Sequence, residues 1–193
     1  MKRLAIYCGS ASPADPIYIE AARMVGTELA RRGIGVVYGG GRLGLMGAVA
    51  DAALAVGGKV IGIIPQALVD AEVAHRGCTE LRVVSGMHER KALFTDLSDG
   101  FITLPGGVGT MDELWEAVSW SQLGYHEKPV GLLNVGGFYD ALIAFNEHMK
   151  SVGFVRPQHG GILIADTSLD GLLAQMAGYR PHETIFKLKA ANL

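Results

Sequence analysis

The sequence predicts an α/β protein built on one Rossmann-like, doubly wound parallel sheet in a single domain. Three observations support this prediction. Short apolar runs alternate with segments of helical periodicity, clusters of glycine follow several of the apolar runs, and a chain of 193 residues suits one domain. No stretch reads as a linker. We therefore expect residues 1–180 to form one Rossmann-like domain and residues 181–193 to form a C-terminal tail.

Short apolar runs bounded by turn residues predict the strands, which are expected at residues 4–8, 35–38, 59–64, 81–84, 100–104, 129–133 and 161–164. The first helix is expected over residues 15–32, because its apolar residues recur at helical spacing and Gly33 ends it. Further helices are expected at residues 45–56, 88–98, 110–123, 138–152 and 168–177. Residues 65–77 are the least periodic part and should form a mobile loop or a short helix.

The composition of the chain argues against several classes of partner and binding site. Seventeen basic and 19 acidic residues give a net charge of −2, which argues against nucleic acid or an anionic membrane as a partner. No apolar stretch reaches the roughly 18 residues that span a bilayer, and the apolar run after the N-terminal basic pair is too short for a signal peptide. We expect a cytoplasmic protein. Cys8 and Cys78 are far apart, and no metal-ligand motif occurs, so we expect no metal and no cofactor.

The sequence GGGRLG at residues 39–44 matches the GxGxxG pattern of dinucleotide-binding loops. That pattern requires an acidic residue about twenty positions later, at the end of the next strand. Pro65 and Gln66 follow that strand here, and the next acid is Asp70, so a dinucleotide site is disfavoured. Two interpretations remain open. The glycines serve tight strand–helix packing, or Gly40 and Gly41 lie against part of a nucleotide.

A second glycine cluster follows the strand expected at residues 100–104 and opens the next helix. Its three glycines allow backbone N–H groups to converge on one anion, and the helix N-terminus favours negative charge there. Thr110 adds a hydroxyl donor, and no lysine follows as in a triphosphate-binding P-loop. The expected ligand is a nucleoside monophosphate or a sugar phosphate. The residues expected to contact it are Gly106, Gly107, Val108, Gly109, Thr110, Met111 and Asp112.

Glu113 allows two interpretations. In the sequence TMDE it completes a capping box with Thr110, or its carboxylate lies one turn from a bound phosphate and contacts the sugar. The sequence MHERK at residues 87–91 also allows two. It is a solvated helix face, or Arg90 and Lys91 lie near the phosphate or the leaving group.

Aromatic residues lie in and just after the helix expected at residues 110–123. Trp115 and Val118 have the spacing of core residues in the helix expected at residues 110–123. The aromatic stretch at residues 120–126 predicts either a second edge of the core or a subunit interface.

Together these motifs resemble the Lonely guy (LOG) family. PGGVGTMDE at residues 105–113 matches its PGGxGTxxE signature, GGGRLGLMG at residues 39–47 resembles its GGGxxGLMG segment, and MHERK resembles its MHxRK segment. PVGLLN at residues 129–134 is similar to one of its strands. The likeness extends over roughly residues 3 to 178. Asp112 stands where many plant members carry a glutamate.

The resemblance implies a Rossmann-like homodimer that hydrolyses cytokinin riboside 5′-monophosphates, and in many bacterial members AMP, to a free base and ribose 5-phosphate. It implies Arg90 and Glu113 as the catalytic pair, and Gly106, Gly107, Gly109 and Thr110 as the phosphate loop. Members are also labelled lysine decarboxylases, but nothing in the sequence reads as a pyridoxal-phosphate site. The other expected substrate-binding residues are Ser10, Gly40, Gly41, Met87 and Lys91.

Two other functions remain as alternatives. The same fold serves non-catalytic carriers of a nucleotide or cofactor, such as proteins that carry the molybdenum cofactor. A dehydrogenase is the third possibility, and the missing acidic residue weakens it.

Overall fold

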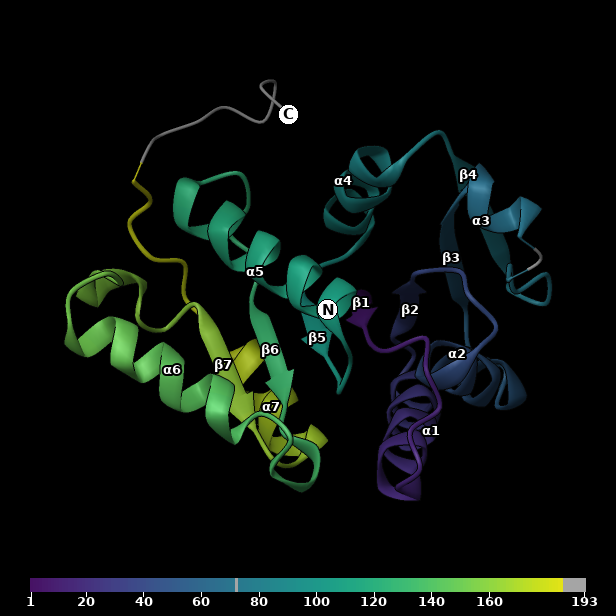
Figure 1. Cartoon of the computed structure of the whole chain (residues 1–193), viewed down its shortest axis with the longest axis horizontal. Coiled ribbons are helices and arrows are strands. Elements are labelled where there is room, and N and C mark those ends of the chain that lie inside the picture. Colours follow the sequence, from purple (N-terminus) through teal and green to yellow (C-terminus); the bar gives the residue numbers. More distant parts are fainter. Residues whose placement is uncertain (72, 186–193) are drawn as a thin grey trace.

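The strands of the sheet all run parallel, as the alternation of strands and helices predicts. A computed structural model describes residues 1–71 and 73–185 (Figure 1). Its strands are β1 (Arg3–Tyr7), β2 (Gly35–Tyr38), β3 (Val60–Pro65), β4 (Glu80–Val84), β5 (Phe101–Thr103), β6 (Val130–Leu133) and β7 (Leu163–Asp166). They lie in the order β4-β3-β2-β1-β5-β6-β7, so the predicted doubly wound, Rossmann-like class is confirmed.

Helices connect the strands and cover both faces of the sheet (Figure 1). They are α1 (Pro16–Arg31), α2 (Gly44–Ala55), α3 (Gln66–Asp70), α4 (Met87–Leu97), α5 (Val108–Leu123), α6 (Asp140–Ser151) and α7 (Leu169–Ala177), with short 3-10 turns η1 (Val135–Gly137) and η2 (Pro157–His159). Asp15 caps α1, where its side chain accepts a hydrogen bond from the Ile17 amide at 3.0 Å. Helix α3 lies within residues 65–77, which were expected to form a mobile loop or a short helix, so this segment does contain a short helix.

Alternation along the strands builds a core on each face of the sheet. Leu4 and Ile6 of β1 pack with buried residues of α1, α2 and α7. The intervening Ala5 and Tyr7 pack with Phe94 of α4 and with residues of α5 and α6. Both faces of β1 are buried because helices lie on both sides, as is usual for a parallel sheet.

The chain reverses its direction of winding between β1 and β5. Strands β2, β3 and β4 follow one another on one side of β1, and β5, β6 and β7 follow on the other. The loops after β1 and β5 diverge at this point, and the Gly9 amide donates to the Pro105 carbonyl at 3.1 Å across it. In open α/β sheets this crevice at the carboxyl ends of the strands is where ligands bind.

Three expectations need correction or limitation. Helix α5 begins at Val108, two residues before the expected Thr110. Helix α6 begins at Asp140 because η1 occupies part of the range expected to be helical. Of the expected tail, residues 186–193 lie outside the described residues. Within the described ranges, no helix is long and apolar enough to cross a membrane.

Candidate active site

A cavity of about 520 Å³ opens at the carboxyl edge of the sheet, beside the crevice between β1 and β5. The volume lies within the range of small-molecule sites, about 300 to 1,000 Å³. Ten of the residues expected to bind substrate or act in catalysis line this cavity: Ser10, Gly41, Met87, Arg90, Gly107, Val108, Gly109, Thr110, Asp112 and Glu113. Residues from four separate parts of the chain thus meet at one place.

Arg90 lines this cavity, although it belongs to the charged sequence MHERK. Its side chain is only 7% exposed. The Nε atom donates to the Ile63 carbonyl at 3.2 Å, and Nη2 donates to the Gly39 carbonyl at 3.3 Å. The guanidinium carbon also lies 5.4 Å from the centre of the Phe94 ring. A buried, hydrogen-bonded cation is not a solvated surface residue, so that interpretation is wrong for Arg90.

Glu113 projects from α5 toward the same guanidinium. Its Oε1 lies 3.7 Å from Nη2 of Arg90, and its side chain is 8% exposed. Burial raises the pKa of Glu113 to about 7, although the positive charge of Arg90 acts in the opposite direction. The carboxyl group therefore changes its charge near neutral pH, which is common for groups at functional sites.

The capping-box interpretation of Glu113 is wrong. Helix α5 starts at Val108 with Gly107 as its N-cap, and no side chain caps it. Thr110 is already inside the helix, so Glu113 lies a full turn too late to complete a box. The helical hydrogen bond from the Met111 amide to the Gly107 carbonyl spans this turn. The amide groups before Met111, at the start of the helix, face the position where an anion would be favoured.

The three glycines of this loop have different roles. A Cβ on Gly106 would lie 2.2 Å from Thr110 Oγ1 and 2.8 Å from the Gly9 amide, so only glycine fits. A Cβ on Gly107 or Gly109 would meet open space, and neither residue has a positive φ. The backbone therefore does not exclude alanine at these two positions. A bound anion would occupy the open space beside Gly107 and Gly109.

The first glycine cluster combines packing with access to the cavity. Gly44 has a φ of +59°, and a Cβ there would lie 2.3 Å from the Ala11 carbonyl, so it permits close packing of two loops. Gly40 has a φ of +70°, and its carbonyl accepts the His75 amide at 2.8 Å. Gly41 forms a bridge to Ala74 and lines the cavity. The packing interpretation is thus confirmed for Gly44. Gly41 reaches the cavity and Gly40 does not line it, so contact between this cluster and a nucleotide stays a prediction for Gly41.

Four of the expected binding residues do not line this cavity: Gly40, Lys91, Gly106 and Met111. Lys91 Nζ lies 2.7 Å from a carboxylate oxygen of Glu116 and 3.3 Å from one of Asp112. The lysine therefore ties α4 to α5 through ion pairs. Met111 faces a separate shallow hollow on the outside of α5.

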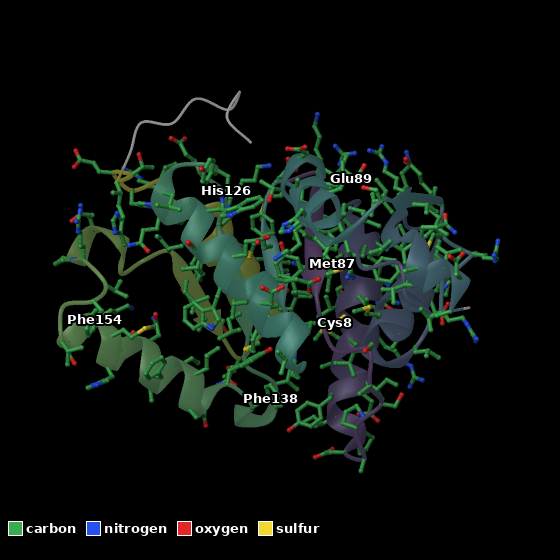
Figure 2. All side chains as sticks on the ribbon, turned by 45° about the horizontal axis from the view of Figure 1, so that its top comes forward. Cys8, Met87, Glu89, His126, Phe138 and Phe154 are labelled. Carbon is green, nitrogen blue, oxygen red and sulfur yellow. The ribbon has the colours of Figure 1, made fainter. Side chains whose placement is uncertain are left out.

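The cavity is also lined by residues that were not named individually as binding residues, although Gly39, Leu43 and Met46 lie in the motif at residues 39–47: Cys8, Gly9, Ala11, Gly39, Leu43, Met46, Ile64, Leu68 and Val73. Cys8 and Met87 are labelled in Figure 2. Position at the end of a strand is the signal that could have indicated Cys8, Gly39 and Ile64. Nothing in the sequence indicates Leu68 or Val73, because they come from the segment with the weakest periodicity.

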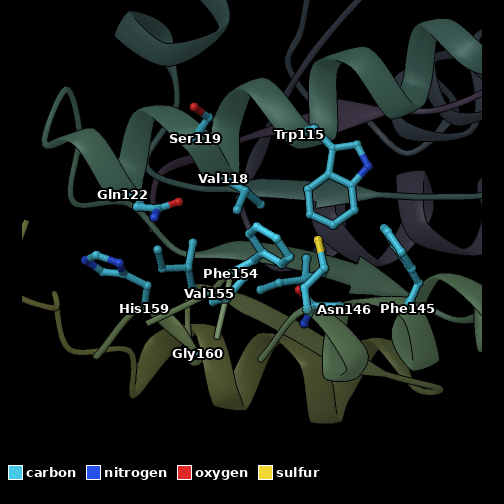
Figure 3. A pocket seen from close by; sticks show the side chains of 13 residues that line it. Trp115, Val118, Ser119, Gln122, Phe145, Asn146, Phe154, Val155, His159 and Gly160 are labelled. Atoms are coloured by element: carbon cyan, nitrogen blue, oxygen red, sulfur yellow. The ribbon is translucent and has the colours of Figure 1, made fainter. Parts of the chain in front are cut away.

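A second, apolar cavity of about 280 Å³ lies between α5 and α6 (Figure 3). Trp115 lines it together with Phe145, Val118 and Phe154, whose side chain is exposed. Trp115 is only partly buried and is not part of the core cluster on this face of the sheet, so the expectation that it belongs to the core is wrong, whereas Val118 packs against that cluster. This cavity shares no lining residue with the one at the sheet edge.

The sheet order and the edge cavity define a Rossmann-like α/β protein with a buried arginine–glutamate pair at the carboxyl ends of its strands. A family model described as "Possible lysine decarboxylase" matches residues 46–176. The chain belongs to this family, which contains the LOG proteins, and the resemblance noted in its motifs is confirmed.

Two curated relatives show how similar the chain is to LOG proteins. It is 47% identical over 180 residues to "Cytokinin riboside 5'-monophosphate phosphoribohydrolase LOG" of Oryza sativa subsp. japonica, covering 93% of this chain and 74% of the relative. It is 43% identical over 180 residues to "Cytokinin riboside 5'-monophosphate phosphoribohydrolase LOG7" of Arabidopsis thaliana, covering 93% and 83%.

Among solved structures, the chain resembles the molybdenum cofactor binding protein of Rippkaea orientalis. The TM-score is 0.67 over 91% of this chain and 95% of that one, at 19% sequence identity. At this level of identity the likeness shows the fold alone.

Proposed function

We propose that this protein is a nucleoside 5′-monophosphate phosphoribohydrolase that releases an adenine-type base and ribose 5-phosphate from cytokinin riboside 5′-monophosphates. One observation carries the proposal: the buried Arg90–Glu113 pair, at 3.7 Å, lies beside the uncapped start of α5 in one cavity. An anion at the helix start and a carboxylate one turn further suit the two ends of a ribose 5-phosphate. The names of the curated relatives support the same reaction.

In the proposed reaction the 5′-phosphate binds at the start of α5, beside Gly107 and Gly109. Binding energy from the phosphate orients the sugar. The C1′–N9 bond breaks with its electron pair going to the base, a water oxygen bonds to C1′, and the proton that this water loses balances the proton that the departing base takes up. The ionised carboxylate of Glu113 stabilises the positive charge that develops on the sugar, as carboxylates do in glycosidases. Arg90 balances negative charge on the departing base.

Apolar side chains on the other side of the cavity support an N6-prenylated base as the preferred substrate. Leu43 and Leu68 line the cavity although both are exposed to solvent, and Met46 and Val73 lie with them. An isoprenoid group that covers these side chains would remove apolar surface from water. AMP lacks that group, so we propose it as the poorer substrate.

The description of the family as lysine decarboxylases does not fit the lysine near this site. Burial acts to lower the pKa of Lys91, but the hydrogen bonds and negative charges of Glu116 and Asp112 outweigh it and raise the pKa. Lys91 therefore stays a charged ammonium group in an ion-pair network. A lysine that forms a Schiff base needs the opposite shift.

The proposal is tested by incubating the purified protein with N6-isopentenyladenosine 5′-monophosphate and, separately, with AMP. The expected products are the free base and ribose 5-phosphate in equal amounts, with the Glu113→Gln variant from the same purification as the control. Tight binding without turnover would instead identify a carrier. EDTA should leave the rate unchanged, because no step uses a metal ion.

Two further properties belong to this proposal. We infer a homodimer, supported by a shallow hollow on α5 that the exposed Val108 lines together with the partly buried Trp115 and Trp120. Light scattering after gel filtration should give about twice 20.4 kDa, and a mass of one chain would contradict it. We also infer a cytoplasmic location, supported by the free thiols of Cys8 and Cys78. Fractionation of the source cells tests this.

A further inference from the structure

We propose that Gly39 is a positioning residue that fixes the Arg90 guanidinium in the cavity. The inference rests on the proposed function, in which Arg90 acts on the substrate. Gly39 follows directly after β2, and its carbonyl oxygen accepts a hydrogen bond from Nη2 of Arg90 at 3.3 Å. The same Nη2 atom lies 3.7 Å from Glu113 Oε1. Gly39 therefore sets the position of the nitrogen that faces the catalytic carboxylate.

The guanidinium is held between the ends of two neighbouring strands. Ile63 of β3 accepts from Nε at 3.2 Å, while Gly39 accepts from Nη2. Strands β2 and β3 pair in parallel, with Tyr38 opposite Gly62, so the two carbonyl groups lie side by side at the sheet edge. Two acceptors on one planar group fix its orientation as well as its position.

The missing side chain of Gly39 is what makes this contact possible. A Cβ there would lie 2.1 Å from Nη2 and 3.3 Å from Cζ of Arg90, so the guanidinium would have to move. The φ of Gly39 is not positive, and alanine can therefore adopt its backbone conformation without strain. Glycine is required here by the arginine and not by the backbone.

Gly41 provides a matched control in the same loop. A Cβ on Gly41 would lie 3.2 Å from Met46 Sδ, the same distance as a Cβ on Gly39. None of the three atoms nearest to the Cβ on Gly41 belongs to Arg90. Its φ is not positive either. Alanine at the two positions thus crowds the same methionine, and only alanine at Gly39 crowds the guanidinium.

The test is a double-mutant cycle with Gly39→Ala and Arg90→Ala, measured both as kcat with N6-isopentenyladenosine 5′-monophosphate and as melting temperature. Gly39→Ala should lower kcat about tenfold or more in the wild-type background and less than about twofold in the Arg90→Ala background. It should lower the melting temperature less when Arg90 is absent. Gly41→Ala should have equal effects in both backgrounds.

Equal effects of Gly39→Ala in both backgrounds would overturn the inference, as would a kcat within about twofold of wild type. If Gly39→Ala fails to fold, folding of the double variant supports the inference and its failure to fold overturns it. The melting temperatures keep this test separate from the proposed function. An inactive wild-type protein would refute the hydrolase, while the coupling between Gly39 and Arg90 would still be measured.

Discussion

Arg90 and Glu113 form a buried ion pair in which Nη2 and Oε1 are 3.7 Å apart. This distance is longer than a hydrogen bond, so the arginine reduces the cost of burying the carboxylate without occupying its oxygen at close range. The carboxylate oxygens therefore stay available to a sugar, and the arginine, held by Gly39 and Ile63, stays available to a base.

Replacing Glu113 with glutamine should lower kcat about 10²- to 10³-fold, because a preorganised charge beside the sugar is lost. Glutamine has nearly the same shape, so the melting temperature should not fall. Steady-state kinetics and a thermal melt on the same preparation check both parts. A kcat close to that of wild type would show that Glu113 has only a structural role.

Arg90→Ala should lower kcat for every nucleoside monophosphate tested, by roughly 10²-fold or more. It also removes the cation that holds down the pKa of Glu113, so part of the loss should be recovered as the pH rises above 7. Arg90→Lys should also be poor, because an ammonium group cannot reach Gly39 and Ile63 together. Wild-type kcat/KM in the lysine variant would contradict the role assigned to the guanidinium.

The stability of the protein should depend on pH through Glu113. Its pKa is 4.5 as a free group and about 7 in the folded protein, so the folded state binds the proton more tightly. The contribution to stability is full below pH 4.5 and is lost as the pH rises through 7. Between pH 4.5 and 8, wild type should lose up to about 3 kcal/mol of unfolding free energy relative to Glu113→Gln. Denaturant titrations at several pH values measure this, and parallel curves would refute the raised pKa.

Alanine should affect stability at one glycine of the α5 loop and nucleotide binding at its neighbour. Gly106→Ala places a methyl group against Thr110 and Gly9, so the melting temperature should fall by several degrees, as for overpacking of about 1–3 kcal/mol. Gly107→Ala meets open space and should melt like wild type, but its methyl group should raise KM for the nucleotide. If Gly107→Ala left KM unchanged, the phosphate would have to bind elsewhere.

Local patterns predicted most of the fold. The apolar runs at residues 35–38 and the periodicity from residue 15 to 32 correspond closely to β2 (Gly35–Tyr38) and α1 (Pro16–Arg31). The start of α5 was placed too late because the capping box at Thr110 was a plausible start signal, and Gly107 makes the cap without a side chain. The order of the strands depends on pairing between distant segments, so only the class of sheet was predictable.

The candidate site was predictable to the extent that its residues lie in motifs. Arg90 and Glu113 come from two such motifs, and the structure places them together. The sequence could not show that Arg90 lines the cavity while its neighbour Lys91 pairs with Glu116 instead. The direction of each side chain depends on what packs around the helix. Gly39 was missed for a related reason, since its importance lies in a contact with Arg90, 51 positions later.

The most direct test of the phosphoribohydrolase is the ratio of kcat/KM for N6-isopentenyladenosine 5′-monophosphate to kcat/KM for the corresponding nucleoside, measured under identical conditions. If the start of α5 binds the 5′-phosphate and thereby orients the ribose against Glu113, the ratio should exceed about a hundred, and the nucleoside should be poorer in kcat as well as in KM. A ratio near one would mean that the glycine loop at Gly106–Gly109 only packs, and the proposed function would be wrong.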